Sequence, residues 1–509
     1  LDRMSKITKQ DVVEWANKYL GPESYAIIYK REGKDPDEQK IAAPKITPIV
    51  TNRDSQSEFL SEIQTSQVQP IEPVFVDYKK DMSQFEAQPG IDVLYKKNET
   101  NDIFTLIYVF NTGTENDPAL NLAFNYLSYL GTDKMTAEEI ASEMYDIACS
   151  FYMNAGANQS SIQITGLSEN MGKAMEIVEG LIAGAKPDEA ILENLKGDML
   201  KSRADAKLNQ SRCFGALQRY LFYGGDFIRR TTLTDPALQA LTSEQLLAKI
   251  GGLMGKQHEV LYYGPQKEAE VKSALAEHHK VAADLQPLEK KFSTLLPTDA
   301  NKVVLAQYDA KQLYYLQFSN RGEKFDVAAD PEITLYNEYF GGGMNTIVFQ
   351  EMREARGLAY SAWATLATPS NANGDYSYYA FIATQNDKMQ KAVEAFDDII
   401  NNMPESEKAF GIAKEALVSR LRTERTVKDG VLWSYLRARD LGLDAPRDKQ
   451  IFEKVQSMTL DDVKAAQQKW VKGRKYVYGI LGDIQDLDLN YLKTLGPIQT
   501  VSQEEIFGY

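Results

Sequence analysis

The chain has 509 residues, of which 43% are hydrophobic and 25% charged, a composition typical of a globular protein with more than one core. Its formal net charge of −15 argues against a nucleic-acid-binding surface, and no run of about 20 apolar residues offers a membrane span. We therefore expect no nucleic-acid partner and no membrane span in this chain.

The first predicted element looks like the end of a domain. Thr8 and Asp11 have the spacing of a helix-capping box, and the amphipathic helix that follows stops at Gly21. Residues 24–30 then have the composition of a strand. The chain also begins at Leu1 without an initiator Met or a signal-peptide pattern. We expect it to be the remainder of a longer protein.

A repeated pattern predicts two similar domains after this tail. A capped helix followed by a strand occurs at 242–263 and again at 459–481. A pair of strands precedes each of them, at 91–111 and at 302–320. The run Leu200-Lys201-Ser202-Arg203 returns as Leu417-Val418-Ser419-Arg420, which is 217 positions later. A period this long is typical of tandem globular domains and not of a solenoid.

The interleaving of strands and amphipathic helices predicts an α+β fold in which helices cover a sheet. We expect two tandem duplicated α/β two-layer domains. The predicted boundaries are a tail of a preceding missing domain at 1–30, a charged and proline-rich linker at 31–75, a first repeat at 76–285 and a second repeat at 286–509.

One glycine-rich run in the second repeat is the candidate site. Gly341, Gly342 and Gly343 let the backbone pass where side chains would clash. A short helix is predicted to begin near Asn345, a good N-cap, and to end at Gly357, a good residue just past a helix. The run therefore predicts a rigid unit of loop and helix.

Two side chains of this unit can carry chemistry. Val348, Phe349 and Met352 can form the buried face of the helix, while Arg353 leaves it and Tyr360 begins an extended segment. Taken alone, an arginine and a tyrosine here are better explained as a surface residue and a core residue. Arg356 is a weaker candidate, because it could equally cap the end of the helix.

The run resembles the C-terminal-half segment of pitrilysin/insulinase-type zinc metallopeptidases, also called inverzincins. In that family an arginine and a tyrosine seven residues apart bind the substrate peptide, and the resemblance gives these roles to Arg353 and Tyr360. It implies that Gly341, Gly342 and Gly343 also belong to the substrate-binding site. It further implies that the zinc ion and the catalytic glutamate lie in the N-terminal half of the longer protein, so this chain is expected to hold no metal and no catalytic residue.

The zinc motif of such a peptidase, H-x-x-E-H on one helix, is not found in the sequence. The resemblance would place it just before Gly131-Thr132, where the two histidines and the glutamate correspond to Leu122, Tyr126 and Asn125. These side chains cannot replace the motif together, so the first repeat is expected to be an inactive copy.

The histidines offer no other metal site. The chain contains His258, His278 and His279, whose spacing does not suit two ligands on one helix face. We expect them to be solvated residues without a role in catalysis.

The function favoured by these patterns is the C-terminal half of a zinc metalloendopeptidase, which would enclose and bind a peptide or small unfolded protein for cleavage by the N-terminal half of the same protein. This chain alone is expected to be inactive. The alternative is a non-catalytic scaffold or interaction protein of the same family, and a more remote one is an unrelated α+β binding protein. The compartment stays open, although the resemblance points to the bacterial periplasm or cell envelope.

Overall fold

The computed structural model describes residues 2–30, 33 and 57–509, and the chain separates into two compact units, residues 1–70 and 71–509. Most of the linker predicted at 31–75 lies outside the described residues. The boundaries proposed for the linker and the two repeats stay predictions. Each compact unit is described by itself.

The first unit contains α1 (Lys9–Tyr19) and α2 (Glu58–Thr65). The predicted capping box at Thr8 and Asp11 is present at the start of α1. The strand predicted at 24–30 is wrong, because these residues form no element. A strand needs a hydrogen-bonded neighbour, and the described part of this unit offers only helices.

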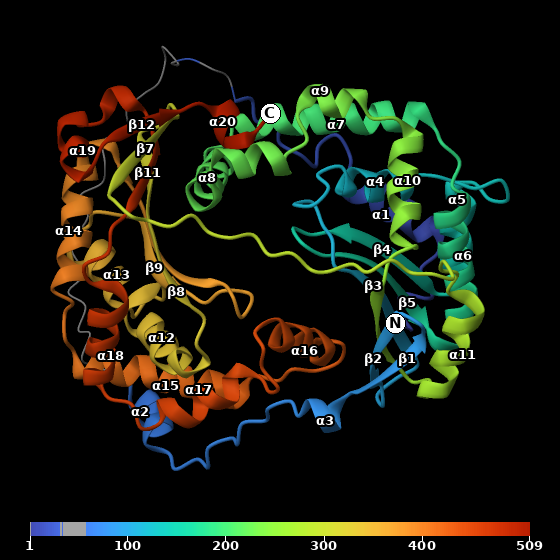
Figure 1. Ribbon diagram of the computed structural model, residues 1–509, viewed down its shortest axis with the longest axis horizontal. Coiled ribbons are helices and arrows are strands. Elements are labelled where there is room, and N and C mark those ends of the chain that lie inside the picture. The colour runs from blue at the N-terminus through green and yellow to red at the C-terminus, as the bar shows by residue number, and fades with distance from the viewer. Residues whose placement is uncertain (1, 31–32, 34–56) are drawn as a thin grey trace. The chain divides into compact units, whose positions relative to one another are not determined.

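The second unit begins with a six-stranded sheet in the spatial order β1-β2-β6-β3-β5-β4 (Figure 1). Neighbouring strands are antiparallel except for β2 and β6, which are parallel. Every residue of β6 is buried, because β6 lies inside the sheet and both of its faces are covered. The strands are β1 (Ser83–Gln88), β2 (Ile91–Lys97), β3 (Ile103–Phe110), β4 (Cys149–Ala155), β5 (Ser160–Leu167) and β6 (His258–Gly264).

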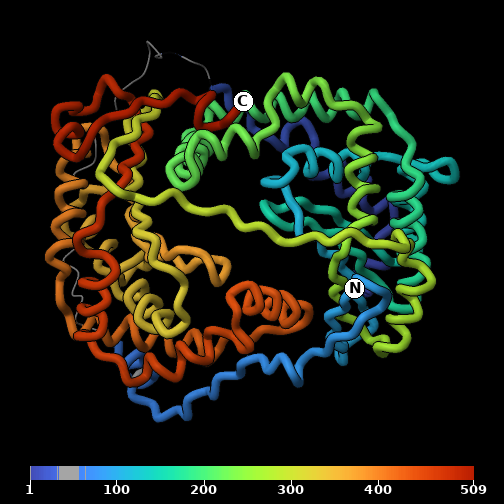
Figure 2. The backbone as a smooth tube through the Cα atoms, viewed as in Figure 1, coloured from blue at the N-terminus to red at the C-terminus, as the bar shows by residue number. Residues whose placement is uncertain are grey.

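Helices of the same repeat pack on one face of this sheet and form its main core. The helices of this region are α3 (Tyr78–Asp81), α4 (Leu120–Leu127), α5 (Ala137–Asp146), η1 (Ser168–Asn170), α6 (Met171–Gly184), α7 (Glu189–Lys207), α8 (Gln210–Thr231), α9 (Asp235–Ala240), α10 (Ser243–Leu253) and α11 (Glu268–His278). The connection at 280–301 then leads to the second sheet, as the backbone trace in Figure 2 shows.

The second sheet also has six strands, in the order β12-β7-β11-β8-β10-β9. When the outer strands β1 and β12 are left aside, the two sheets have the same order and the same directions, with β7 and β11 parallel as β2 and β6 are. The strands are β7 (Lys302–Gln307), β8 (Gln312–Lys324), β9 (Ser361–Ala367), β10 (Asp375–Gln385), β11 (Val477–Gly482) and β12 (Ile498–Val501).

The helices of the second repeat follow the order of the first. They are η2 (Val327–Ala329), α12 (Asp330–Tyr336), η3 (Asn337–Gly341), α13 (Ile347–Phe349), η4 (Gln350–Ala355), η5 (Asn386–Lys388), α14 (Met389–Asn401), α15 (Glu407–Thr423), α16 (Gly430–Asp440), α17 (Arg447–Val455), α18 (Leu460–Ala466), η6 (Gln467–Val471), η7 (Ile484–Asp486), α19 (Leu489–Leu495) and α20 (Gln503–Phe507). Leu200 and Leu417 lie in equivalent helices, α7 and α15. The predicted α+β fold with a duplicated architecture is confirmed.

The two repeats exchange one helix each. Leu217 of α8, in the first repeat, is fully buried in a cluster with Leu316 and Val477 of the second sheet. Leu432 of α16, in the second repeat, is fully buried in a cluster with Leu261 of the first sheet. Each sheet therefore has its own helices on one face and a helix of the other repeat on the opposite face.

An ion pair between an exposed arginine and a nearly buried glutamate accompanies this exchange. Arg439 of α16 donates two hydrogen bonds to the carboxylate of Glu259 in β6, at 2.5 and 2.8 Å. The pair raises the pKa of Arg439, chiefly through the hydrogen bond to Glu259. A bidentate arginine–carboxylate contact fixes the orientation of the two side chains as well as their distance. It therefore holds α16 in one register on the first sheet.

Candidate functional site

All of the predicted site residues lie between α12 and β9. The chain there passes through the π-helix η3, a glycine turn, the single turn α13 and a second π-helix, η4. The equivalent helices of the first repeat, α4 and α5, are regular α-helices. Short π-helices are frequent at functional sites, because the wider turn displaces side chains from their usual helical positions. The second repeat has this feature on both sides of its glycine turn.

The three glycines are not equivalent. A Cβ on Gly341 would lie 2.7 Å from the carbonyl oxygen of Ala364 in β9, so the close contact between turn and strand requires glycine. Gly342 and Gly343 are exposed, and a Cβ at either position would have ordinary contacts. The predicted backbone clash therefore applies to Gly341 alone. The other two keep the surface of the turn free of side chains.

The helix begins one residue later than predicted. Thr346, and not Asn345, is the N-cap of α13, with an extended backbone at ψ 158°. The Thr346 hydroxyl donates to the Gly343 carbonyl oxygen at 2.7 Å and so closes the glycine turn. At the other end, Gly357 has the predicted left-handed conformation, with φ +57°.

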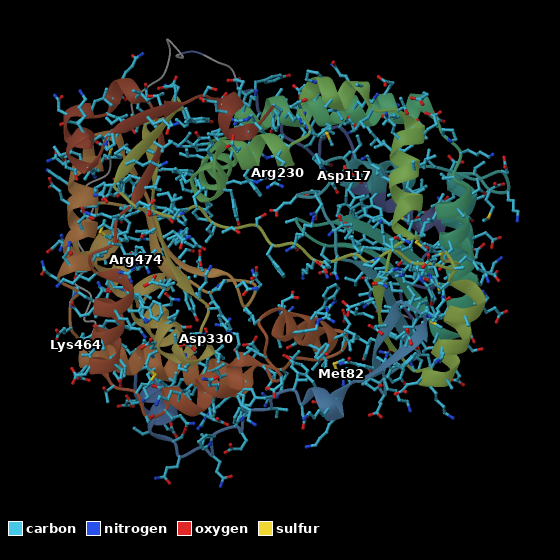
Figure 3. The ribbon with its side chains drawn as sticks, viewed as in Figure 1. Met82, Asp117, Arg230, Asp330, Lys464 and Arg474 are labelled. Atoms are coloured by element: carbon cyan, nitrogen blue, oxygen red, sulfur yellow. The ribbon has the colours of Figure 1, made fainter. Side chains whose placement is uncertain are left out.

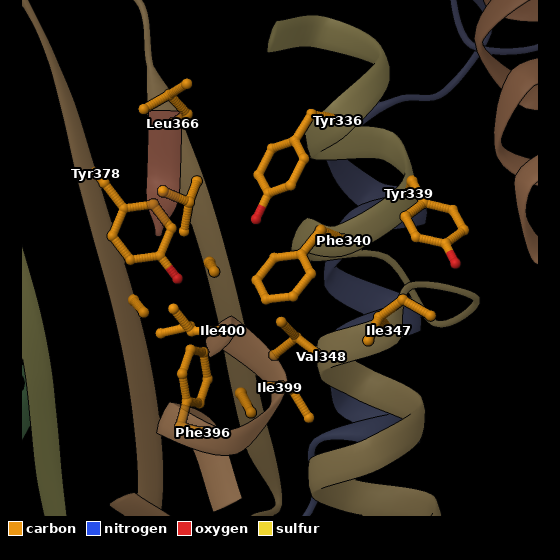
Figure 4. Packing of buried hydrophobic residues seen from close by; sticks show 14 of the residues in the cluster. Tyr336, Tyr339, Phe340, Ile347, Val348, Leu366, Tyr378, Phe396, Ile399 and Ile400 are labelled. Carbon is orange, nitrogen blue, oxygen red and sulfur yellow. The ribbon is translucent and has the colours of Figure 1, made fainter. Parts of the chain in front are cut away.

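The hydrophobic core holds the site helix, which consists of α13 and η4, in place. Val348 and Met352 are fully buried, as predicted, and Figure 4 shows Val348 beside Phe340 in the main core of the second repeat. Phe349 is only half-buried, so its assignment to the buried face is wrong. The anchored helix leaves the ring of Phe349 at the surface, on the side of Arg353.

The structure brings Arg353 and Tyr360 together. The guanidinium carbon of Arg353 lies 4.7 Å from the centre of the Tyr360 ring and 4.9 Å from the centre of the Phe349 ring. Cation–π contacts at these distances restrict the arginine between two aromatic faces. Phe349 was missed as a site residue, although its position four residues before Arg353 places both on one helix face.

The polar groups of this pair remain open to solvent. The Arg353 side chain is 37% exposed, and its ion pair with Glu354 is long, at 3.6 Å. Tyr360 is 76% exposed, and within the described residues its hydroxyl makes no hydrogen bond. The pair therefore presents several N–H groups and one phenol to a ligand that carries acceptor oxygens.

Arg356 has a different environment. Its guanidinium forms ion pairs with Glu351 at 3.4 Å and with Asp398 of α14 at 3.1 Å. The hydrogen bonds from Asn402 and from Arg356 lower the pKa of Asp398. Arg356 therefore ties the end of the site helix to α14 and is not available to a ligand as Arg353 is.

Tyr360 stands at the start of an edge strand. β9 follows it directly and is the outermost strand of its sheet, paired through residues 361–367 with β10. On the edge that faces away from β10, the backbone N–H and C=O of Leu366 are bonded to the Asn337 side chain at 2.9 and 3.0 Å, and the Ala364 carbonyl oxygen lies against Gly341. An extended chain could therefore pair only with the beginning of β9, beside Tyr360 and Arg353.

The corresponding positions of the first repeat do not fit a zinc ion. Leu122, Asn125 and Tyr126 all lie on α4, with Leu122 and Tyr126 buried. The Tyr126 hydroxyl donates to Ser243 at 2.7 Å and accepts from the backbone N–H of Asp188 at 2.7 Å. A leucine, an amide and an engaged phenol supply no set of zinc ligands.

Two of the histidines are buried, so the prediction that they are solvated is wrong. His258 and His279 are 4% and 1% exposed, and their Nε2 atoms are 2.9 Å apart. The other nitrogen of His279 lies 2.6 Å from the Glu179 carboxylate, and that of His258 lies 2.8 Å from the Lys256 carbonyl oxygen. The rings pair with each other and satisfy buried polar groups.

The described residues offer no other metal site and no membrane-spanning helix. They contain no group of three or more His, Cys, Asp or Glu side chains placed to hold a metal ion. In the same residues, each helix is too short or too polar to cross a bilayer.

Part of the sequence matches the model of a known protein family. Residues 257–417, from β6 to α15, match the model of the Peptidase M16 inactive domain. The pitrilysin/insulinase-type resemblance is confirmed, as peptidase M16. An uncharacterized zinc protease of Streptomyces coelicolor is 23% identical over 266 residues, which are 48% of this chain and 56% of that relative.

Several solved structures share this fold. An M16 inactive domain from Pseudomonas fluorescens superposes with a TM-score of 0.62 at 18% identity, covering 79% of this chain and 98% of that one. The ferredoxin protease FusC, solved in complex with Arabidopsis ferredoxin, has a TM-score of 0.62 at 13% identity and covers 94% of this chain. The match takes up 51% of FusC, so this chain spans about half the length of that protein.

Proposed function

We propose that this chain is the non-catalytic half of a zinc metalloendopeptidase, which encloses and binds the peptide that a zinc site in the other half cleaves. The observation that carries the proposal is the Arg353–Tyr360 pair, preformed by ring contacts and open to solvent at its donor groups. Peptide carbonyl oxygens are the acceptors that such donors suit.

The position of the pair supports a peptide substrate. It lies at the start of the edge strand β9, away from the part of that edge bonded to Asn337, and an extended peptide can add to a free strand edge through main-chain hydrogen bonds. The guanidinium and the phenol could then hold the scissile peptide or support the negative charge that develops on its oxygen. The metal and the general base belong to the other half in this proposal, since the residues on α4 do not fit zinc.

The M16 relationship is also compatible with a scaffold that has lost peptidase activity. The inactive-domain match favours this alternative as much as the enzyme half. The coding sequence upstream of Leu1 distinguishes the two. An intact H-x-x-E-H motif there supports the enzyme, and a degenerate one supports the scaffold.

The test is an Arg353→Ala substitution in the full-length protein. We expect kcat/KM for peptide cleavage to fall by about 10²- to 10³-fold, the usual effect of losing one preorganised donor. Zinc content and thermal unfolding should match the wild type. Arg356→Ala, on the same helix but paired with two carboxylates, is the control and should retain activity within about threefold. Full activity of the Arg353 variant would contradict the proposal.

A further inference from the structure

A pocket lies between helices of the first repeat and the C-terminal residues of the second repeat, away from the glycine turn. It has a volume of about 380 Å³ and opens between α4, α7, α8 and the C-terminal α20. Leu122 of α4 forms part of its wall, at the position that would carry a zinc ligand in an active copy. This volume suits a small ligand or the end of a peptide and not a folded partner.

The charged residues that line the pocket are all arginines. They are Arg203 of α7 and Arg212 and Arg219 of α8. Over the whole chain, acidic residues outnumber basic ones by 72 to 57. The charged side chains of the pocket wall are therefore basic, in contrast to the chain as a whole, and a basic wall favours an anion.

Two of these arginines have neighbours that partly balance them. Arg203 pairs with Asp235 and donates to the Leu233 carbonyl oxygen at 2.6 Å. Arg219 donates to the Thr231 hydroxyl at 2.7 Å. Burial lowers the pKa of Arg219, while the nearby Glu115 acts in the opposite direction. The carboxylates of Asp235 and Glu115 thus offset two of the three positive charges.

Arg212 supplies the remaining positive charge. It is exposed, and among the described residues its side-chain hydrogen bond goes to the Ser202 hydroxyl, at 3.5 Å, and not to a carboxylate. The pocket also contains Thr232, whose buried hydroxyl has no hydrogen-bond partner in the described structure. The guanidinium of Arg212 therefore remains for a ligand.

The remaining wall is apolar. Met199 and Leu233 line the pocket, and Ile506 and Phe507 of α20 close it from the C-terminal side. The ring of Tyr509 lies 4.4 Å from the Arg203 guanidinium carbon and holds that side chain in place. An apolar group and an oxyanion can thus be bound together.

We infer that this pocket binds the C-terminal carboxylate of a peptide whose last side chain is apolar. The carboxylate would accept hydrogen bonds from Arg212 and Arg219, and the side chain would contact the apolar wall. The shared chemistry is an oxyanion next to arginines, for which inorganic phosphate is the simplest competitor. The inference does not depend on the proposed peptidase function, because binding requires neither zinc nor the other half.

The experiment measures binding to the purified chain by isothermal titration calorimetry. The probes are acetyl-Gly-Gly-Leu as the free acid, the same peptide as the C-terminal amide, and inorganic phosphate. We expect the acid to bind at least tenfold more tightly than either of the other two probes. Equal affinity for acid and amide, equal affinity for acid and phosphate, or no binding of the acid would overturn the inference.

Variants locate the binding. Arg212→Gln changes an exposed side chain and should weaken binding of the acid about tenfold, with unchanged thermal unfolding. Arg219→Gln should have a similar effect and provides a second, more buried probe. Arg230→Gln is the matched control, since Arg230 lies on α8 outside the pocket wall and is labelled in Figure 3. Loss of binding in the Arg230 variant, or none in both pocket variants, would contradict the site.

Discussion

The guanidinium of Arg353 and the ring of Tyr360 are in contact across the end of the site helix, with 4.7 Å between the guanidinium carbon and the ring centre. Phe349 lies 4.9 Å from the same carbon and confines the arginine further. The seven-residue spacing of the pair thus has a physical explanation. The helix ends at Ala355, and just past it the left-handed backbone of Gly357 turns the chain so that Tyr360 returns to Arg353.

The first prediction concerns metal content. The purified chain should contain no stoichiometric zinc after dialysis, because the positions on α4 carry a leucine, an asparagine and an engaged tyrosine. Elemental analysis by mass spectrometry measures this directly. One zinc ion per chain, retained through dialysis, would show that the assignment of the metal to another half is wrong.

The second prediction concerns the exchanged helices. Leu217→Ala in α8 and Leu432→Ala in α16 each remove a fully buried side chain from a cluster shared by the two repeats. Each change should lower the free energy of unfolding by about 2–5 kcal/mol, the usual range for a buried leucine. Urea denaturation followed by circular dichroism measures the loss. Leu208→Ala, at a site that is 79% exposed, is the control. Wild-type stability in either buried variant would disprove the exchange.

Structural features that depend only on residues close together in the sequence are predicted correctly. The capping boxes at Thr8, Thr242 and Thr459 are all present, because a side chain and a backbone N–H three residues apart are enough to form one. The strand at 24–30 is not formed, because pairing depends on a neighbour that local composition does not reveal. The exchange of α8 and α16 is equally nonlocal, since both helices are amphipathic whichever sheet they cover.

The candidate site was predicted less completely. Arg353 and Tyr360 could be paired because their spacing resembles a known family, whereas the contact of Phe349 depends on how deeply the helix sinks into the core. The burial of His258 and His279 was missed for a related reason. His279 is paired with Glu179, which is distant in the sequence, so its burial cannot be predicted from its neighbours in the chain. His258 contacts the backbone of the nearby residue Lys256.

The third prediction is an acid-sensitive stability that comes from His258. Burial, together with the nearby His279, lowers the pKa of His258 from 6.5 to about 4. The unfolded chain therefore binds a proton between pH 6.5 and 4 that the folded chain does not, and stability falls as the pH falls through this window. At 1.36 kcal/mol per pH unit, the loss by pH 4 is about 3 kcal/mol.

A substitution separates His258 from the other groups that titrate in this window. His258→Gln can still donate a hydrogen bond to the Lys256 carbonyl oxygen but cannot titrate. Between pH 7 and pH 4, the free energy of unfolding of the wild type should therefore fall by about 3 kcal/mol more than that of the variant. A constant difference across this range would show that His258 does not contribute to the acid sensitivity.

The most direct test of substrate binding is Tyr360→Phe in a full-length protein with demonstrated peptidase activity. The substitution keeps the ring under the Arg353 guanidinium and removes only the exposed hydroxyl. We predict that kcat/KM falls by about 10²-fold, with zinc content and unfolding temperature unchanged, because one donor to the reacting peptide is lost. Wild-type kcat/KM in this variant would contradict the account and leave Tyr360 as an exposed residue that only positions Arg353.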